Sequence, residues 1–339
     1  MKFADGKVKK TKKSLVVFSL IGLLICGLVI SALVVRNTYN QNLQPLSTTS
    51  KKHVVTIKPG STTSQIATTL KNKGVIKSDW AFEWYVRNRQ SKEDLKAGTF
   101  VFDQNQSVQE IVGIIVGGKV ASDLITILPG KSLVQTRADL IKAGYTNAEV
   151  EAAFEPSQYS KHPALIDKPK EASLEGYLYP ETFQKTADTT LKEIINLSLD
   201  EMQLRLTSEV RQAIAKQGLT LHQGITLASI VEGEVDSAED RAQVGQVFRK
   251  RLKEGIRLES NATDEYAKTD PKYDSYKVDG LPPGPIGNFT ESSLNSVAFP
   301  AGTDWLYFVT GDNGQTHFSK TLAEHEALIQ KYCTTLCGR

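Results

Sequence analysis

A run of 21 uncharged, mostly apolar residues at 15–35 constrains this chain more than any other feature of its sequence. As a helix it rises about 1.5 Å per residue, which suffices to cross a hydrocarbon core about 30 Å thick. The alternative is a secretory signal, whose apolar region is about 7–15 residues long and precedes a small-residue cleavage site. Because this run is longer and leads directly into Arg36, we favour an uncleaved, single-pass transmembrane helix in the lipid bilayer.

The charges on either side of the run predict its direction. Residues 1–14 contain six lysines and one aspartate, whereas Arg36 is the only charged residue directly after the run. The positive-inside rule then places the N-terminus in the cytoplasm and about 300 residues outside the cell membrane, in an extracellular or periplasmic location. The chain carries a net charge of +3, but the part after residue 14 is slightly acidic. That part lacks the positive charge that attracts nucleic acid, so we expect no nucleic-acid partner.

The pattern of apolar residues predicts an α+β fold. We divide the chain into a basic cytoplasmic tail at 1–14, a transmembrane helix at 15–35, a polar linker at 36–52, a small module at 53–122 and a larger domain at 123–339. The module has the order strand, helix, helix, strand, helix, which is enough for a core of its own. The larger domain is predicted to be mostly helical with a small sheet, including helical regions at 186–217 and 219–235.

One acidic residue is unusually placed on the predicted helix at 219–235. At 100° per residue, Glu232 lies within the apolar stripe of this helix, and Glu234 lies on the opposite side. A carboxyl group short of water has a raised pKa, which is what a general acid needs at neutral pH. In the alternative interpretation Glu232 ends the helix, turns to solvent or pairs with Arg241. Position on the helix alone does not decide between these.

The sequence offers no site for a metal ion or an organic cofactor. Its five histidines are scattered, and it has no Cys-x-x-Cys pair and no glycine-rich nucleotide loop. We therefore expect no metal and no cofactor. Cys333 and Cys337 are four residues apart near the C-terminus, a spacing that suits a disulfide poorly, and the sequence leaves their pairing open.

Several blocks of the sequence, in order, resemble the YceG-like, or MltG-type, endolytic murein transglycosylases. After the basic tail and the apolar run, these blocks are VTIKPGSTTSQIATTL, LKAGTF, ITILPG, SLEGYLYPETF, LASIVEGEV, VFRKRLKEGIRLES, GLPPGPIGN and WLYFVTGDNGQTHFSKTLAEH. The resemblance implies a LysM-like module near the membrane at 53–122 and a YceG-like catalytic domain at 123–339. It also implies a lyase that cleaves nascent peptidoglycan glycan strands between N-acetylmuramic acid and N-acetylglucosamine and leaves a 1,6-anhydro end.

The same resemblance assigns roles to individual residues. Glu232 matches the family's catalytic glutamate and would act first as acid and then as base. The acetamido group of the substrate shields the cationic centre, so a second carboxylate is not required. The candidate substrate-binding residues are Glu175, Tyr177, Asn261, Tyr266, Tyr276 and Asn288. At the family level, penicillin-binding proteins and other cell-wall synthesis proteins are expected as partners.

Two segments depart from the family pattern and keep alternatives open. This chain reads LESNATDEY where relatives read close to LQTDPTV.Y, and YDSY where they read YNTY, so Asn261, Ala262, Asp264 and Asp274 put details of substrate contact in doubt. One alternative is a muramidase-type hydrolase of the same bond, with Asp236 or Glu175 as the second carboxylate. The other is a non-catalytic cell-wall-binding protein.

Overall fold

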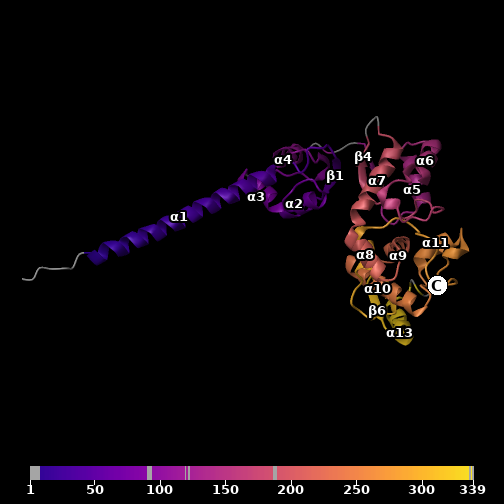
Figure 1. Cartoon of the computed structure of the whole chain (residues 1–339). Coiled ribbons are helices and arrows are strands. Elements are labelled where there is room, and N and C mark those ends of the chain that lie inside the picture. The colour runs from indigo at the N-terminus through magenta and orange to yellow at the C-terminus, as the bar shows by residue number, and fades with distance from the viewer. Residues whose placement is uncertain are drawn as a thin grey trace, which may run out of the picture. The chain divides into compact units, whose positions relative to one another are not determined.

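The computed structural model describes residues 8–89, 94–118, 120, 123–185, 189–335 and 337, with side chains from residue 25 onward. Contacts within it divide the chain into two compact units, Met1–Ser122 and Asp123–Arg339 (Figure 1). The structure is a helix-rich α+β fold in which the described strands form two-stranded antiparallel sheets.

The first unit has the order of elements that the sequence predicts for the module. Its elements are α1 (Val8–Leu43), β1 (Lys52–Ile57), α2 (Thr63–Asn72), α3 (Asp79–Asn88), β2 (Gly98–Asp103) and α4 (Val108–Gly117). Strands β1 and β2 pair antiparallel, with Val55 opposite Phe100. Both side chains are fully buried in the core of this unit, together with apolar side chains of α2, α3 and α4.

Helix α1 extends beyond the apolar run into the segment that follows it. It continues as a single helix to Leu43, so the first half of the segment predicted as a polar linker, 36–52, is helical. Within the residues that the structure describes, no helix meets the length and apolarity needed to cross a membrane. The side chains of residues 1–24, which include the first part of the predicted span, lie outside that description.

The second unit is built mainly from helices. It contains β3 (Leu124–Thr126), α5 (Leu133–Lys142), α6 (Asn147–Ala153), β4 (Thr182–Gln184), α7 (Leu191–Arg205), α8 (Ser208–Lys216), α9 (Leu221–Glu234), α10 (Ala238–Glu254), α11 (Asp264–Ala267), α12 (Glu291–Ala298), β5 (Tyr307–Thr310), β6 (Thr316–Ser319) and α13 (Leu322–Tyr332). The helical region predicted at 186–217 is therefore two helices. Thr207 adopts an extended conformation between them and caps α8 through its side chain.

Helix α9 lies at the centre of this unit, against α8, α10 and α12 (Figure 1). Its N-terminus is fixed by a capping box between Thr220 and Gln223, and residues 224–231 are all buried. Helices α10 and α12 approach closely at Gly245, where an added Cβ would lie 2.5 Å from the Ser296 carbonyl oxygen. Helices α10 and α12 therefore pack directly against each other, and both contact α9.

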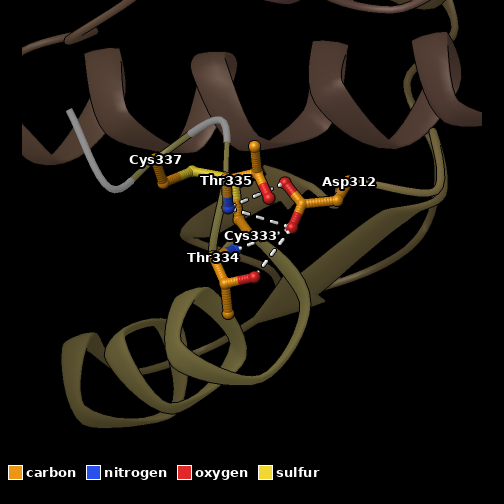
Figure 2. Close-up of a disulfide and its surroundings, with 5 residues drawn as sticks. All are labelled: Asp312, Cys333, Thr334, Thr335 and Cys337. Carbon is orange, nitrogen blue, oxygen red and sulfur yellow. Dashed lines mark hydrogen bonds between the residues drawn. A yellow bond between two sulfur atoms is a disulfide. The ribbon is translucent and has the colours of Figure 1, made fainter.

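A disulfide joins Cys333 and Cys337 directly after α13 (Figure 2). The expectation that this spacing suits a disulfide poorly is therefore wrong, because the chain turns there. The Asp312 carboxylate, on the β5–β6 turn, accepts hydrogen bonds from the Thr334 amide at 2.9 Å and its hydroxyl at 3.0 Å. The Thr335 amide donates to the same carboxylate, which fastens the C-terminal turn to the hairpin.

Candidate active site

The two glutamates at the end of α9 have different surroundings. The Glu232 side chain is 5% exposed and forms an ion pair with Arg241, 3.0 Å from Oε1 to the guanidinium. Its Oε2 accepts hydrogen bonds from the Thr290 amide at 2.9 Å, the Thr290 hydroxyl at 2.8 Å and the Ser293 hydroxyl at 2.5 Å. Four donors on one carboxylate join α9 to α10 and to the start of α12.

This arrangement corrects the premise on which Glu232 was chosen. The helical wheel places Glu232 on the buried side, and the structure agrees. The apolar surroundings expected for its carboxyl group are not found, because Arg241, Thr290 and Ser293 surround the carboxylate. The alternative interpretation, an ion pair with Arg241, is the one observed.

Glu234, the last residue of α9, meets a different segment of the chain. Its Oε1 accepts hydrogen bonds from the Ser260 hydroxyl and from the Ala262 amide, the latter at 3.1 Å. From the described residues, no hydrogen bond reaches its Oε2. Burial raises the pKa of this carboxyl despite the two hydrogen bonds, and the nearby charge of Asp264 raises it further. Glu234 therefore combines a raised pKa with an oxygen, Oε2, that receives no hydrogen bond from the described residues.

Two of the predicted substrate-binding residues lie beside Glu234. The Tyr276 hydroxyl donates a hydrogen bond of 2.6 Å to Asn261 Oδ1, and both side chains are exposed. Burial of part of the ring, together with the charges of Asp264 and Glu234, raises the pKa of Tyr276. Asn261 is adjacent to Ala262, whose amide contacts Glu234, so one short segment brings the acid and these polar groups together.

Glu175 and Tyr266 form a second pair connected to the same segment. Both Glu175 oxygens accept from the Leu133 amide at the start of α5, at 3.1 and 3.0 Å, and the Tyr266 hydroxyl donates to Oε2. Burial raises the pKa of Glu175 to about 7, although the Leu133 and Gly176 amides and the charge of Arg137 act in the opposite direction. Segment 260–266 therefore contacts both buried acids, Glu234 near its start and Glu175 at its end.

The turn that holds Glu175 depends on the next residue. Gly176 has φ +76°, and a Cβ there would lie 2.4 Å from the Pro285 side chain. Only glycine fits both this conformation and this contact. The turn therefore packs directly against the proline-rich loop at 281–288.

Two other residues predicted to bind substrate, Tyr177 and Asn288, make hydrogen bonds within the protein. Tyr177 is buried, and its hydroxyl is 2.8 Å from His222 Nδ1, while His222 Nε2 lies 3.2 Å from the Pro283 carbonyl oxygen. Asn288 is buried as well; its side-chain Oδ1 accepts from the Lys131 backbone amide at 3.0 Å, and its backbone amide donates to the Lys131 carbonyl at 2.9 Å. Both residues therefore fasten the proline-rich loop, and their contact with sugar stays a prediction.

A second carboxylate beside Glu232 is also not found where the sequence suggested it. Helix α9 ends at Glu234 and Val235 is extended, so Asp236 is not one helical turn from Glu232. Among the described residues, no three histidine, cysteine or carboxylate side chains are grouped so as to bind a metal ion.

Sequence reasoning did not assign Glu234 to the site, and it missed the contacts of Glu234 with Ser260 and Ala262. One signal was available in Gly233, between the two glutamates. A Cβ at this position would lie 2.8 Å from the Ala262 Cβ, so the absence of a side chain lets segment 260–266 pass close to α9 in this chain.

Comparisons with known proteins match this chain to one family. Residues 55–331 match the YceG-like family. A Bacillus subtilis protein named endolytic murein transglycosylase is 30% identical over 320 residues, which cover 86% of this chain and 88% of that protein. A Streptococcus pneumoniae serotype 2 protein of the same name is 27% identical, and the match spans only 60% of its length. A crystal structure of a yceG-like protein from Listeria monocytogenes, 30% identical, matches with a TM-score of 0.54 over 83% of this chain and 100% of that one.

Proposed function

The chain belongs to the YceG-like family, and on that premise we propose that it is a lytic transglycosylase that cleaves the glycan strands of peptidoglycan. The names of the relatives support the class of enzyme and substrate. The observation that carries the proposal is the surroundings of Glu234, a buried carboxyl with a raised pKa and one unoccupied oxygen beside exposed polar groups.

In the proposed reaction, Glu234 acts first as general acid. It protonates the glycosidic oxygen as the bond from N-acetylmuramic acid C1 to that oxygen breaks, and the acetamido group of the substrate shields the cationic centre. The Glu234 carboxylate then accepts the proton of the C6 hydroxyl, whose oxygen bonds to C1. The product has a 1,6-anhydro end, no water is consumed and Glu234 regains its proton.

The choice of Glu234 over Glu232 follows from what each carboxylate can offer a substrate. The Arg241 ion pair and three hydrogen bonds occupy both oxygens of Glu232. A general acid needs a proton to give and an oxygen within reach of the substrate. We therefore assign Glu232 to positioning, because it holds the end of α9 against α10 and α12.

Asn261 and Tyr276 are proposed to contact the sugar beside the scissile bond. Their exposed amide and hydroxyl groups suit hydrogen bonds to hydroxyl and acetamido groups, and the Tyr276 ring suits stacking on a pyranose face. Glu175 and Tyr266 are proposed to position segment 260–266 through the hydrogen bond between them. Glu175 is not required as a second reacting carboxylate in this scheme.

We propose further that residues 15–35 anchor the enzyme in the cell membrane in a single pass with a cytoplasmic N-terminus. The uncharged run and the six preceding lysines support this topology. An anchored enzyme meets glycan strands where they leave the membrane, so penicillin-binding proteins and other synthesis proteins are the expected neighbours.

The products made in water labelled with oxygen-18 test the proposed reaction. Purified glycan strands are incubated with the full chain, and the new ends are analysed by mass spectrometry. The proposal predicts 1,6-anhydro ends without label. Labelled reducing ends would identify a hydrolase, and uncut strands at every enzyme concentration would identify a binding protein.

A further inference from the structure

Two tryptophans lie on the outer side of α3 in the first unit. Trp80 and Trp84 are 43% and 54% exposed, whereas Phe82 and Val86 on the opposite side of the same helix are buried. Positions four apart on a helix are neighbours on its surface. The two indoles therefore form one exposed stripe, which the core of the unit does not require.

The end of α1 completes this stripe. The ring centroid of Tyr39 is 5.9 Å from that of Trp80 and 6.4 Å from that of Trp84. Nearby, the Lys77 ammonium donates to the Gln41 carbonyl at 3.4 Å. We call Tyr39, Trp80 and Trp84 the aromatic cluster; it belongs at once to the module and to α1.

The aromatic cluster lies close to the end of the apolar run, measured along α1. Tyr39 follows Val35, the last residue of the apolar run, by four residues of uninterrupted helix, a rise of about 6 Å. The polar region of a bilayer extends about 5–7 Å beyond the hydrocarbon core on each side. Tryptophan and tyrosine concentrate in this region, where the ring is buried and its polar group reaches water.

The charges around the cluster suit a surface of lipid phosphates. Arg36 on α1 and Arg87 on α3 are exposed. Both acidic residues of α3 have partners, Asp79 in an ion pair with Lys71 at 3.1 Å and Glu83 in a hydrogen bond from Ser64 at 3.0 Å. Cations beside an aromatic cluster are attracted to phosphate headgroups.

We propose that the aromatic cluster lies in the headgroup region of the membrane and seats the module at 52–117 on the lipid surface. This inference rests on the proposed anchoring by residues 15–35. The continuous helix to Leu43 supports it, because a module joined by a flexible linker would not be held at a fixed distance from the bilayer.

The chain contains three tryptophans, which makes the test direct. The full chain is reconstituted in phosphatidylcholine vesicles with acyl chains brominated near the headgroup or near the chain end, and tryptophan fluorescence is measured. In the Trp305→Phe variant, the tryptophan fluorescence comes from the aromatic cluster alone. In the Trp80→Phe/Trp84→Phe variant, it comes from Trp305 in the second unit alone. We expect strong quenching of the cluster by bromine near the headgroup, weaker quenching by bromine near the chain end, and little quenching of Trp305.

Flotation of the washed vesicles in a density gradient separates this inference from the anchoring. A chain that floats with the vesicles but keeps its cluster fluorescence overturns the inference and leaves the anchoring intact. Equal quenching of Trp305 also overturns it, since the contact would not be specific to the cluster. A chain that does not float overturns both. An emission shift on addition of glycan strands, without quenching by lipid, would assign the cluster to strand binding instead.

Discussion

Replacing Glu232 with alanine is expected to destabilise the second unit strongly. The change leaves Arg241, whose side chain is 11% exposed, without its carboxylate partner, and removes the acceptor for Thr290 and Ser293. Removing one member of a buried ion pair costs about 3–5 kcal/mol. For a unit of this size each kcal/mol lowers the unfolding temperature by about 2–4 °C, so the expected decrease is about 6–20 °C.

The measurement is thermal unfolding followed by Trp305 fluorescence in the Trp80→Phe/Trp84→Phe background, which isolates the second unit. Glu254→Gln is the matched control, because Glu254 is an exposed glutamate on α10, and its effect is expected to stay within about 0.5 kcal/mol. Glu232→Gln keeps the shape of the side chain and should cost about 1–3 kcal/mol while retaining cleavage below its unfolding temperature. The reasoning is refuted if Glu232→Ala has the same unfolding temperature as the control. It is also refuted if a fully folded Glu232→Gln makes no product.

Three further predictions follow from the site. Gly176→Ala should lower the stability of the second unit by at least about 1–3 kcal/mol, because the new Cβ combines a strained φ with a contact to Pro285; denaturant unfolding that matches the native chain would contradict this. Folding raises the pKa of Glu175 from 4.5 to about 7, so the contribution of this group to the free energy of unfolding is fully present below pH 4.5 and is lost as the pH rises through 7. Glu175→Gln should therefore flatten the fall in unfolding temperature between these pH values, and an unchanged slope would be inconsistent with this prediction. Because the raised pKa of Glu234 sets its protonated fraction, cleavage should decline as the pH rises through that pKa, and a rate that climbs steadily into the alkaline range would oppose its role as acid.

Much of the fold could be predicted from local patterns. Apolar spacing located α9, and the pattern of predicted strands and helices matched the order of elements in the first unit. The break at Thr207 was missed because the apolar spacing continues through it into α8. The disulfide was missed because spacing alone does not reveal the turn after α13.

The candidate site was harder to predict, for a physical reason. A helical wheel reports which side of α9 a glutamate faces, but not what it meets there. Three of the four donors to Glu232 come from Thr290 and Ser293, about 60 residues away in the sequence, and those to Glu234 come from Ser260 and Ala262. Both carboxyls are buried, so the partners that distinguish them become visible only when the chain is folded.

The most direct test of the account is cleavage by Glu234→Gln. This change keeps the size of the side chain and its hydrogen bond with Ala262 but removes the proton that the reaction needs. A general acid contributes a factor of about 10²–10⁴, so we expect 1,6-anhydro ends to fall by at least that much while the unfolding temperature is maintained. Glu232→Gln, assayed beside it, should still release anhydro products. A folded Glu234→Gln that cuts glycan strands at the native rate would contradict the central claim.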